Sequence, residues 1–194
     1  IKPQENAPKE QVQEIINLFN EGLLDQAIHE INTLSNIYPL SPLLFNISGA
    51  FYKSRGQYKI AIQKFEQAIN LKSNYAEAHY NLGVTLGEIG KINESITCYK
   101  NALNIKKEYP DAHNNLGNIY LDLSQYELSI EHFEWAVAYK PDFAEAHNNL
   151  GIANRVIGRL DEAGENFDKA LSINPDFISA TNCRGLLHQD MGQH

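Results

Sequence analysis

The sequence has few cysteines and no long apolar run, and each shortage excludes a class of protein. Its 194 residues include only two cysteines, Cys98 and Cys183, which lie in no paired or metal-ligand spacing. A disulfide-stapled miniprotein is therefore excluded, and a reducing compartment is indicated. No apolar run approaches the roughly 18 residues that a membrane-spanning helix needs. We therefore expect a cytoplasmic protein with no membrane segment.

Positive charge is also scarce. Lys and Arg number 16 against 24 Asp and Glu, so the net charge is −8. Arginine occurs only at positions 55, 155, 159 and 184. Binding to nucleic-acid phosphates needs clustered Lys and Arg, so recognition of nucleic acid through a basic surface is excluded.

What the sequence has in abundance is self-similarity with a period of 34 residues. The words AEAHYNLG, PDAHNNLG and AEAHNNLG begin at Ala76, Pro110 and Ala144. This frame predicts a leader at 1–7, five units at 8–41, 42–75, 76–109, 110–143 and 144–177, and a last helix at 178–194. That last helix is either the first helix of a sixth unit or a capping helix. Because the chain starts at Ile1 and stops inside the pattern, we expect a fragment of a longer protein.

Each unit carries the pattern of two amphipathic helices. The first segment repeats apolar residues at helical spacing and ends at a Gly suited to the left-handed conformation. Small residues at repeat positions 8, 20 and 27 allow close helix approach around a larger residue at position 24. The glycines at position 15 that end the first segment are Gly22, Gly56, Gly90, Gly158 and Gly192, and Ser124 is the one exception. One hairpin cannot bury both of its faces, so the sequence predicts an all-α solenoid of stacked antiparallel helix pairs.

These positions resemble the signature of the tetratricopeptide repeat, with Leu-Gly at positions 7 and 8, Ala at 20 and 27, an aromatic residue at 24 and Pro at 32. The resemblance covers roughly residues 8–190 and weakens at the ends. In the sixth unit Arg184 and His188 stand where apolar residues are usual. The resemblance implies a right-handed superhelical solenoid. It also implies a non-catalytic scaffold that holds a peptide in a concave groove lined by the first helix of each unit.

The groove positions of that family are rich in asparagine in this chain. A primary amide has donors and an acceptor, so it can bond the N–H and the C=O of an extended peptide whatever its side chains are. The arrangement resembles the asparagine ladder in the repeat region of O-linked N-acetylglucosamine transferase. With 21 Asn in the chain, a solvated amide surface is the alternative. The predicted groove residues are Asn46, Lys53, Tyr80, Asn81, Asn114, Asn115, Asn118, Asn148, Asn149 and Arg155.

Charge at the groove positions indicates the class of peptide. Five acids outnumber the two bases, Lys53 and Arg155, and the acids are Glu77, Glu88, Asp111, Asp122 and Glu145. An acidic C-terminal tail is therefore a poor ligand, and a neutral or basic protein segment is expected. An acid at position 2 also stabilises the start of its own helix, which explains part of the excess without any ligand.

Three histidines, His79, His113 and His147, recur at repeat position 4. One histidine per unit lies too far from the next for shared ligation at the roughly 2.0–2.1 Å that zinc requires, so we expect packing roles and no metal site. We expect Trp135 to be a partly exposed outer-helix residue rather than a stacking platform. We expect both cysteines to be inert thiols, because neither has an activating neighbour in the sequence.

The sequence predicts a protein- or peptide-binding scaffold with no cofactor and no catalytic residues. It holds no Gly-rich phosphate loop, no Gly-x-Ser-x-Gly and no His-Glu-x-x-His. Two alternatives stay open: the recognition arm of a larger glycosyltransferase or sulfotransferase, which similar repeats precede in bacteria, and a self-assembly module. An end at His194 leaves Ile178, Leu186 and Leu187 on an open apolar face, which favours association through the terminal helix.

Overall fold

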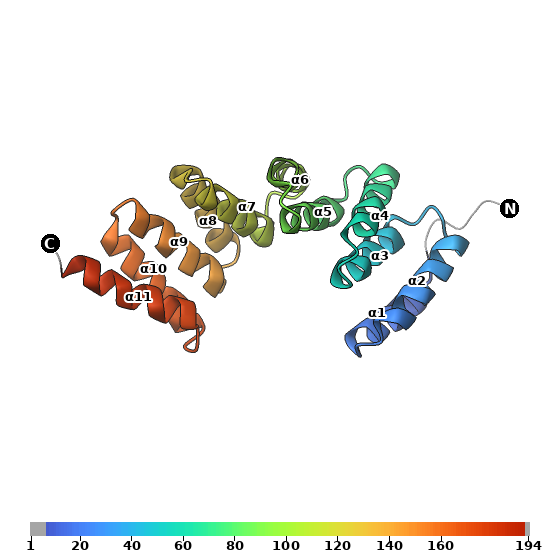
Figure 1. Cartoon of the computed structure of the whole chain (residues 1–194), viewed down its shortest axis with the longest axis horizontal. Coiled ribbons are helices and arrows are strands. Elements are labelled where there is room, and N and C mark those ends of the chain that lie inside the picture. Colours follow the sequence, from blue (N-terminus) through green and yellow to red (C-terminus); the bar gives the residue numbers. More distant parts are fainter. Residues whose placement is uncertain (1–6, 193–194) are drawn as a thin grey trace. The chain divides into compact units, whose positions relative to one another are not determined.

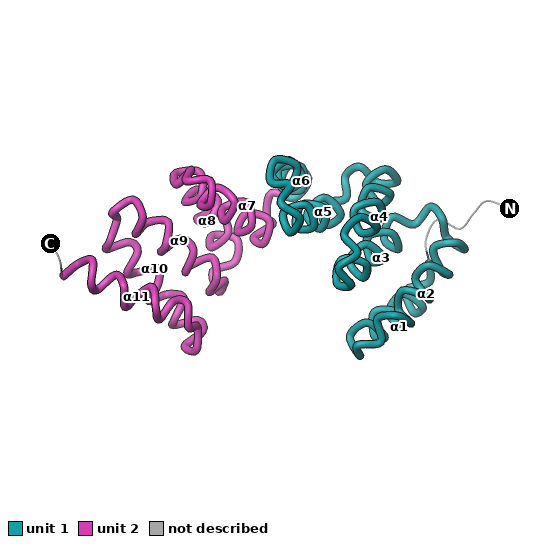
Figure 2. Tube along the Cα trace, viewed as in Figure 1, with its two compact units in different colours: residues 1–106 teal, residues 107–194 magenta. Residues whose placement is uncertain are grey.

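The computed structural model describes residues 7–192 and divides the chain into two compact units, residues 1–106 and 107–194 (Figures 1 and 2). All regular secondary structure in the described residues is helical, which confirms the all-α prediction. Apart from Ala7, the expected leader lies outside the described residues. Within residues 7–192, no helix combines the length and the apolar character needed to cross a bilayer.

Unit 1 consists of three helix pairs, and unit 2 of two pairs followed by a single helix. The helices of unit 1 are α1 (Lys9–Asn20), α2 (Leu24–Ile37), α3 (Pro42–Ser54), α4 (Tyr58–Leu71), α5 (Ala76–Glu88) and α6 (Ile92–Ile105). The helices of unit 2 are α7 (Pro110–Asp122), α8 (Tyr126–Tyr139), α9 (Ala144–Val156), α10 (Leu160–Ile173) and α11 (Ile178–Met191).

Two kinds of helix contact build each unit. Every helix packs on the next one along the chain, from α1 to α6 in unit 1 and from α7 to α11 in unit 2. The first helices of successive pairs also touch one another: α3 packs on α5, α7 on α9, and α9 on α11. The polar residues predicted for the groove lie on these first helices.

The closest packing within a pair joins a glycine on the first helix to an aromatic ring on the second. A Cβ atom added at Gly117 would lie 2.7 Å from the Phe133 ring, and one added at Gly151 would lie 2.6 Å from the Phe167 ring. Both rings are fully buried. In unit 1, Gly49 faces Phe65 at 2.6 Å and Gly83 faces Tyr99 at 3.1 Å. The predicted close approach at position 8 is therefore confirmed.

All five turns inside the helix pairs use the left-handed conformation, four of them at a glycine. Position 15 has a φ between +75° and +82° at Gly22, Gly56, Gly90 and Gly158. Ser124 adopts the same region at φ 57°, although L-residues other than Gly rarely do so. The prediction for Gly192 was wrong: its φ is −80°, which lies in the right-handed helical region.

The terminal helix α11 is anchored to α10 by one apolar and one charged residue. Leu187 is fully buried against Ala163 and Phe167, so placing it on an open face was wrong. Arg184 makes a bidentate pair with Asp168, with Nε–Oδ1 and Nη2–Oδ2 distances of 2.6 and 3.1 Å. Ile178 is 74% exposed, as expected for a residue on the open face.

Candidate functional site

In unit 1, a short row of polar side chains links α3 to α5. Asn81 Nδ2 donates a hydrogen bond to Asn46 Oδ1 at 3.0 Å, and Asn46 Nδ2 lies 3.5 Å from the Tyr75 hydroxyl. Burial raises the pKa of Tyr75 and the charge of Glu77 raises it further, against a smaller lowering by Asn46. The phenol therefore keeps its proton at neutral pH and can either donate or accept. We call Asn46 and Asn81 the amide pair of unit 1.

In unit 2, a longer network joins α7 to α9. Asn114 Nδ2 donates to Glu145 Oε1 at 3.1 Å. Asn149 Nδ2 donates both of its hydrogens, to Asn114 Oδ1 at 3.1 Å and to Asn118 Oδ1 at 3.0 Å. We call Asn114, Asn118, Asn149 and Glu145 the amide network of unit 2. The hydrogen bonds of this network join residues that are 31 or 35 positions apart in the sequence. The Asn46–Asn81 bond of unit 1 also joins residues 35 positions apart.

The network breaks off where α9 meets α11. Asn148 is 2% exposed, and its Oδ1 atom is buried without a partner among residues 7–192. Its Nδ2 atom makes only long contacts, 3.4 Å to Asn149 Oδ1 and 3.5 Å to Ser179 Oγ. By the 35-residue spacing, the donor to Asn148 would come from position 183, which is a cysteine. A thiol is a weak donor, which explains the unpaired oxygen.

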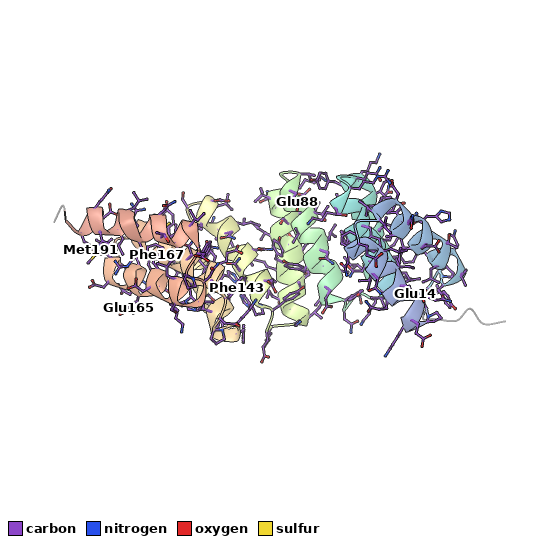
Figure 3. The ribbon with its side chains drawn as sticks, turned by 90° about the horizontal axis from the view of Figure 1, so that it is seen from below. Glu14, Glu88, Phe143, Glu165, Phe167 and Met191 are labelled. Atoms are coloured by element: carbon purple, nitrogen blue, oxygen red, sulfur yellow. The ribbon has the colours of Figure 1, made fainter. Side chains whose placement is uncertain are left out.

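Both basic groove residues are paired with acids. Lys53 Nζ lies 2.9 Å from Oε1 of Glu88, the last residue of α5 (Figure 3). Arg155 Nε lies 2.5 Å from Asp190 Oδ2. Among the residues that the structure describes, the acids Asp111, Asp122 and Glu145 form no ion pair. The groove positions of unit 2 therefore carry uncompensated negative charge.

All ten predicted groove residues lie on α3, α5, α7 and α9, but they differ in exposure. Asn46 is 9% exposed, and Asn114 and Asn148 are 2% exposed. These position-5 amides lie between first helices, where they hold their neighbours and offer a ligand little surface. The other seven are half-buried: Lys53, Tyr80, Asn81, Asn115, Asn118, Asn149 and Arg155.

The position-4 histidines tie each first helix to the loop before it. The Nε2 atoms of His79, His113 and His147 lie 3.0–3.1 Å from the carbonyl oxygens of residues 73, 107 and 141. A carbonyl only accepts hydrogen bonds, so each Nε2 carries the hydrogen. The predicted packing role of these histidines now has a defined contact.

His147 Nδ1 lies 3.4 Å from Asn166 Oδ1, and His113 makes a second contact of a different kind. Its Nδ1 atom lies 3.0 Å from His132 Nδ1, so His132 donates and His113 accepts. Burial lowers the pKa of His113, and the Lys107 carbonyl and the charge of Glu131 oppose that lowering. Burial therefore favours the neutral form of His113, which accepts this hydrogen bond at Nδ1.

Trp135 and Cys98 behave as the sequence predicts. Trp135 is 45% exposed on α8, and its ring stacks on Tyr139 with a centroid separation of 5.5 Å. Cys98 is buried, and burial together with the charges of Glu66 and Glu94 raises its pKa to about 11. At neutral pH this thiol stays protonated and is a poor nucleophile.

Comparisons with known proteins agree with the helix-pair architecture. A family model described as TPR repeat matches residues 49–90 and 88–124, and one described as Tetratricopeptide repeat matches residues 114–176. The chain therefore belongs to the tetratricopeptide repeat family. Comparison with the curated proteins gives no match.

Solved structures of other repeat proteins are similar. MamA is 27% identical, with 82% of this chain and 93% of MamA covered and a TM-score of 0.73. YrrB, a TPR protein with an unusual peptide-binding site, is 19% identical, with 93% of each chain covered and a TM-score of 0.71. The first TPR of Spaghetti (RPAP3), bound to the HSP90 peptide SRMEEVD, is 23% identical. That match covers 62% of this chain and 96% of the other, with a TM-score of 0.60. The last two show likeness of fold alone.

Proposed function

We propose that this chain is a scaffold that binds extended protein segments on two polar faces, one formed by α3 and α5 in unit 1 and the other by α7 and α9 in unit 2. The observation that carries this proposal is the bonding of Asn81 and Asn149 to amides of the preceding first helix, at 3.0–3.1 Å. Half-buried amides held in this way are ordered before a ligand arrives, which lowers the entropic cost of binding. Two proteins of similar fold support it, since YrrB has a peptide-binding site and the Spaghetti repeat is bound to a peptide.

The preferred segment is neutral or basic. Lys53 and Arg155 are engaged by Glu88 and Asp190, so they offer little to a carboxylate. The unpaired acids of unit 2 repel an acidic chain and attract a basic one. A recognition arm of a larger glycosyltransferase or sulfotransferase would use the same surface, so the titrations below apply to it as well.

The test is titration calorimetry of unrelated neutral peptides against the chain and against a variant with Asn81, Asn115 and Asn149 replaced by Ala. Each lost hydrogen bond is worth about 0.5–1.5 kcal/mol, so all the peptides should weaken together while circular dichroism stays unchanged. A control variant with Ala at three exposed asparagines of α4 and α6, Asn70, Asn101 and Asn104, should bind as the parent does. Equal affinity of all three proteins would reject the proposed surface.

The charge preference has its own test. The acidic peptide SRMEEVD should bind more weakly than a peptide of equal length with Lys in place of its acids, and the gap should narrow at high salt. Tighter binding of the acidic peptide would overturn this preference and leave the proposed surface standing.

Self-association is a second candidate function, favoured by the exposed apolar residues of α11. Ile178, Leu186 and Met191 are 74%, 45% and 44% exposed. Sedimentation over a concentration range should show assembly that a variant with Ser at all three positions loses. A strictly monomeric parent would remove this candidate.

A further inference from the structure

We infer that Glu145 sets the direction of the hydrogen bonds in the amide network of unit 2. Asn149 then accepts a hydrogen bond from a ligand N–H, and Asn118 donates one to a ligand C=O. This inference rests on the proposed peptide-binding function and states how the main chain of the peptide is recognised.

The direction starts at Glu145, because a carboxylate oxygen accepts hydrogen bonds and cannot donate them. The Asn114 group that lies 3.1 Å from Glu145 Oε1 is therefore the NH₂ group. The Asn114 oxygen must then face the other way, toward Asn149. An oxygen in that place requires Asn149 to turn its own NH₂ group toward Asn114, at 3.1 Å.

The same direction fixes what Asn149 and Asn118 can offer to a ligand. An amide nitrogen carries two hydrogens, and Asn149 donates them to Asn114 and Asn118. What remains is its Oδ1 atom, which among residues 7–192 is approached by Asn148 Nδ2 at a long 3.4 Å. Asn118 uses its oxygen for Asn149, and among residues 7–192 its NH₂ group has no acceptor. Both side chains are half-buried, so both keep some surface toward solvent.

An acceptor on α9 beside a donor on α7 matches one residue of an extended main chain. In an extended strand the N–H and C=O of a residue lie on the same edge and can bond the same neighbour. An ammonium or guanidinium group has donors only and would leave the Asn118 NH₂ unpaired. The ligand chemistry is therefore a secondary amide backbone, and Glu145 is a positioning residue that acts through Asn114.

The first experiment needs no ligand. Side-chain amide signals of Asn149 are followed by NMR in the parent, in Glu145→Gln, and in Glu165→Gln, which removes an exposed acid on α10. The two Asn149 amide hydrogens should be protected from exchange with water in the parent. Protection should be lost in Glu145→Gln, because Gln can donate as well as accept and the network can then reverse. Glu165→Gln should retain it.

The second experiment measures binding of a Gly-Ser dodecapeptide and of a matched depsipeptide in which alternate amides are esters. Each ester removes an N–H and keeps an extended chain. The parent and Glu165→Gln should bind the depsipeptide about 2- to 12-fold more weakly per lost contact. This discrimination should shrink in Glu145→Gln, because reversal moves the free acceptor to Asn118 and the free donor to Asn149, so the acceptor is no longer held at one place. Each of the three proteins still presents an NH₂ donor, so the weaker acceptor strength of an ester carbonyl lowers the depsipeptide affinity of all three.

The outcomes distinguish failure of the inferred hydrogen-bond direction from failure of the proposed peptide-binding function. Equal binding of peptide and depsipeptide by the parent, or Asn149 protection that survives in Glu145→Gln, would overturn this inference. Absence of binding to both probes, with the expected exchange pattern, would overturn the proposed function and leave the role of Glu145 as a positioning residue intact.

Discussion

The two units share their packing and differ in the direction of their polar links. In unit 1 the amide pair ends on the Tyr75 hydroxyl, which can donate or accept, so the Asn46–Asn81 bond can run in either direction. In unit 2 the network ends on the carboxylate of Glu145, which permits one direction only. The same type of residue occurs at the equivalent place in unit 1, where Glu77 lies 4.0 Å from Lys106 and makes no bond to Asn46.

This difference shows that the asparagine residues alone do not determine whether the surface offers donors or acceptors to a ligand. Asn81 uses one of its two amide hydrogens and keeps a donor and an acceptor, whereas Asn149 uses both and keeps only its oxygen. Neighbours 31 and 35 residues away decide what each amide offers. Residues outside the ligand contact therefore contribute to specificity.

The largest expected effect tests the packing that the units share. Gly49→Ala in unit 1 and Gly117→Ala in unit 2 should each lower the free energy of unfolding by about 1–3 kcal/mol, because a Cβ there overlaps a buried ring. Gly83→Ala should cost less, since its Cβ would lie 3.1 Å from Tyr99. Urea unfolding followed by circular dichroism measures all three.

Gly185 supplies the control, because an added Cβ would meet nothing within 4 Å. Gly185→Ala should be neutral or stabilising by up to about 1 kcal/mol, through helix propensity. If Gly185→Ala lowered the free energy of unfolding as much as Gly117→Ala does, overlap between the added Cβ and an aromatic ring would not be the cause of the destabilisation.

An intermediate effect extends the network of unit 2. Cys183→Asn should place an amide donor beside the unpaired Asn148 oxygen and raise the free energy of unfolding by about 1 kcal/mol, since an unsatisfied buried acceptor costs about 1–3 kcal/mol. Cys183→Ala removes the thiol without adding a donor and should give no such gain. If the two variants have equal melting temperatures, the orphan oxygen is already satisfied in solution.

The smallest effect concerns pH and distinguishes His113 in unit 2 from His79 in unit 1. The lowered pKa of His113 means that folding favours its neutral form. Its contribution to stability is complete above the ordinary pKa of about 6.5 and is lost as the pH falls through the lowered value. Gln in place of His keeps a donor for the Lys107 carbonyl and does not titrate.

When the pH is lowered from about 7.5 to about 5, the melting temperature of the parent should therefore fall further than that of His113→Gln. His79→Gln has the same carbonyl tie in unit 1 and serves as the matched control. Parallel pH profiles for the parent and His113→Gln would contradict the assignment.

The fold was largely predictable from the sequence, and the site only in part. A period of 34 residues with small residues at fixed positions determines which helices meet, as the Gly117–Phe133 contact shows. The placement of the ten polar residues on first helices follows from the same period. What the sequence did not predict is which amide hydrogens are already used, because that depends on atoms of neighbouring helices. The burial of Leu187 was missed for the same reason: α10 covers it.

The contrast between the two thiols gives the chain a selective point of chemical modification. Cys98 is buried, and its pKa is about 11, so almost none of it is thiolate at neutral pH. Cys183 is partly exposed on α11, at the place where the amide network of unit 2 breaks off. Although no neighbour in the sequence activates Cys183, its partial exposure lets a thiol-directed fluorophore react there, beside the candidate surface, and leaves the buried Cys98 untouched. The fluorescence of a label on the native Cys183 can thus report whether a ligand occupies that surface, and no cysteine has to be introduced.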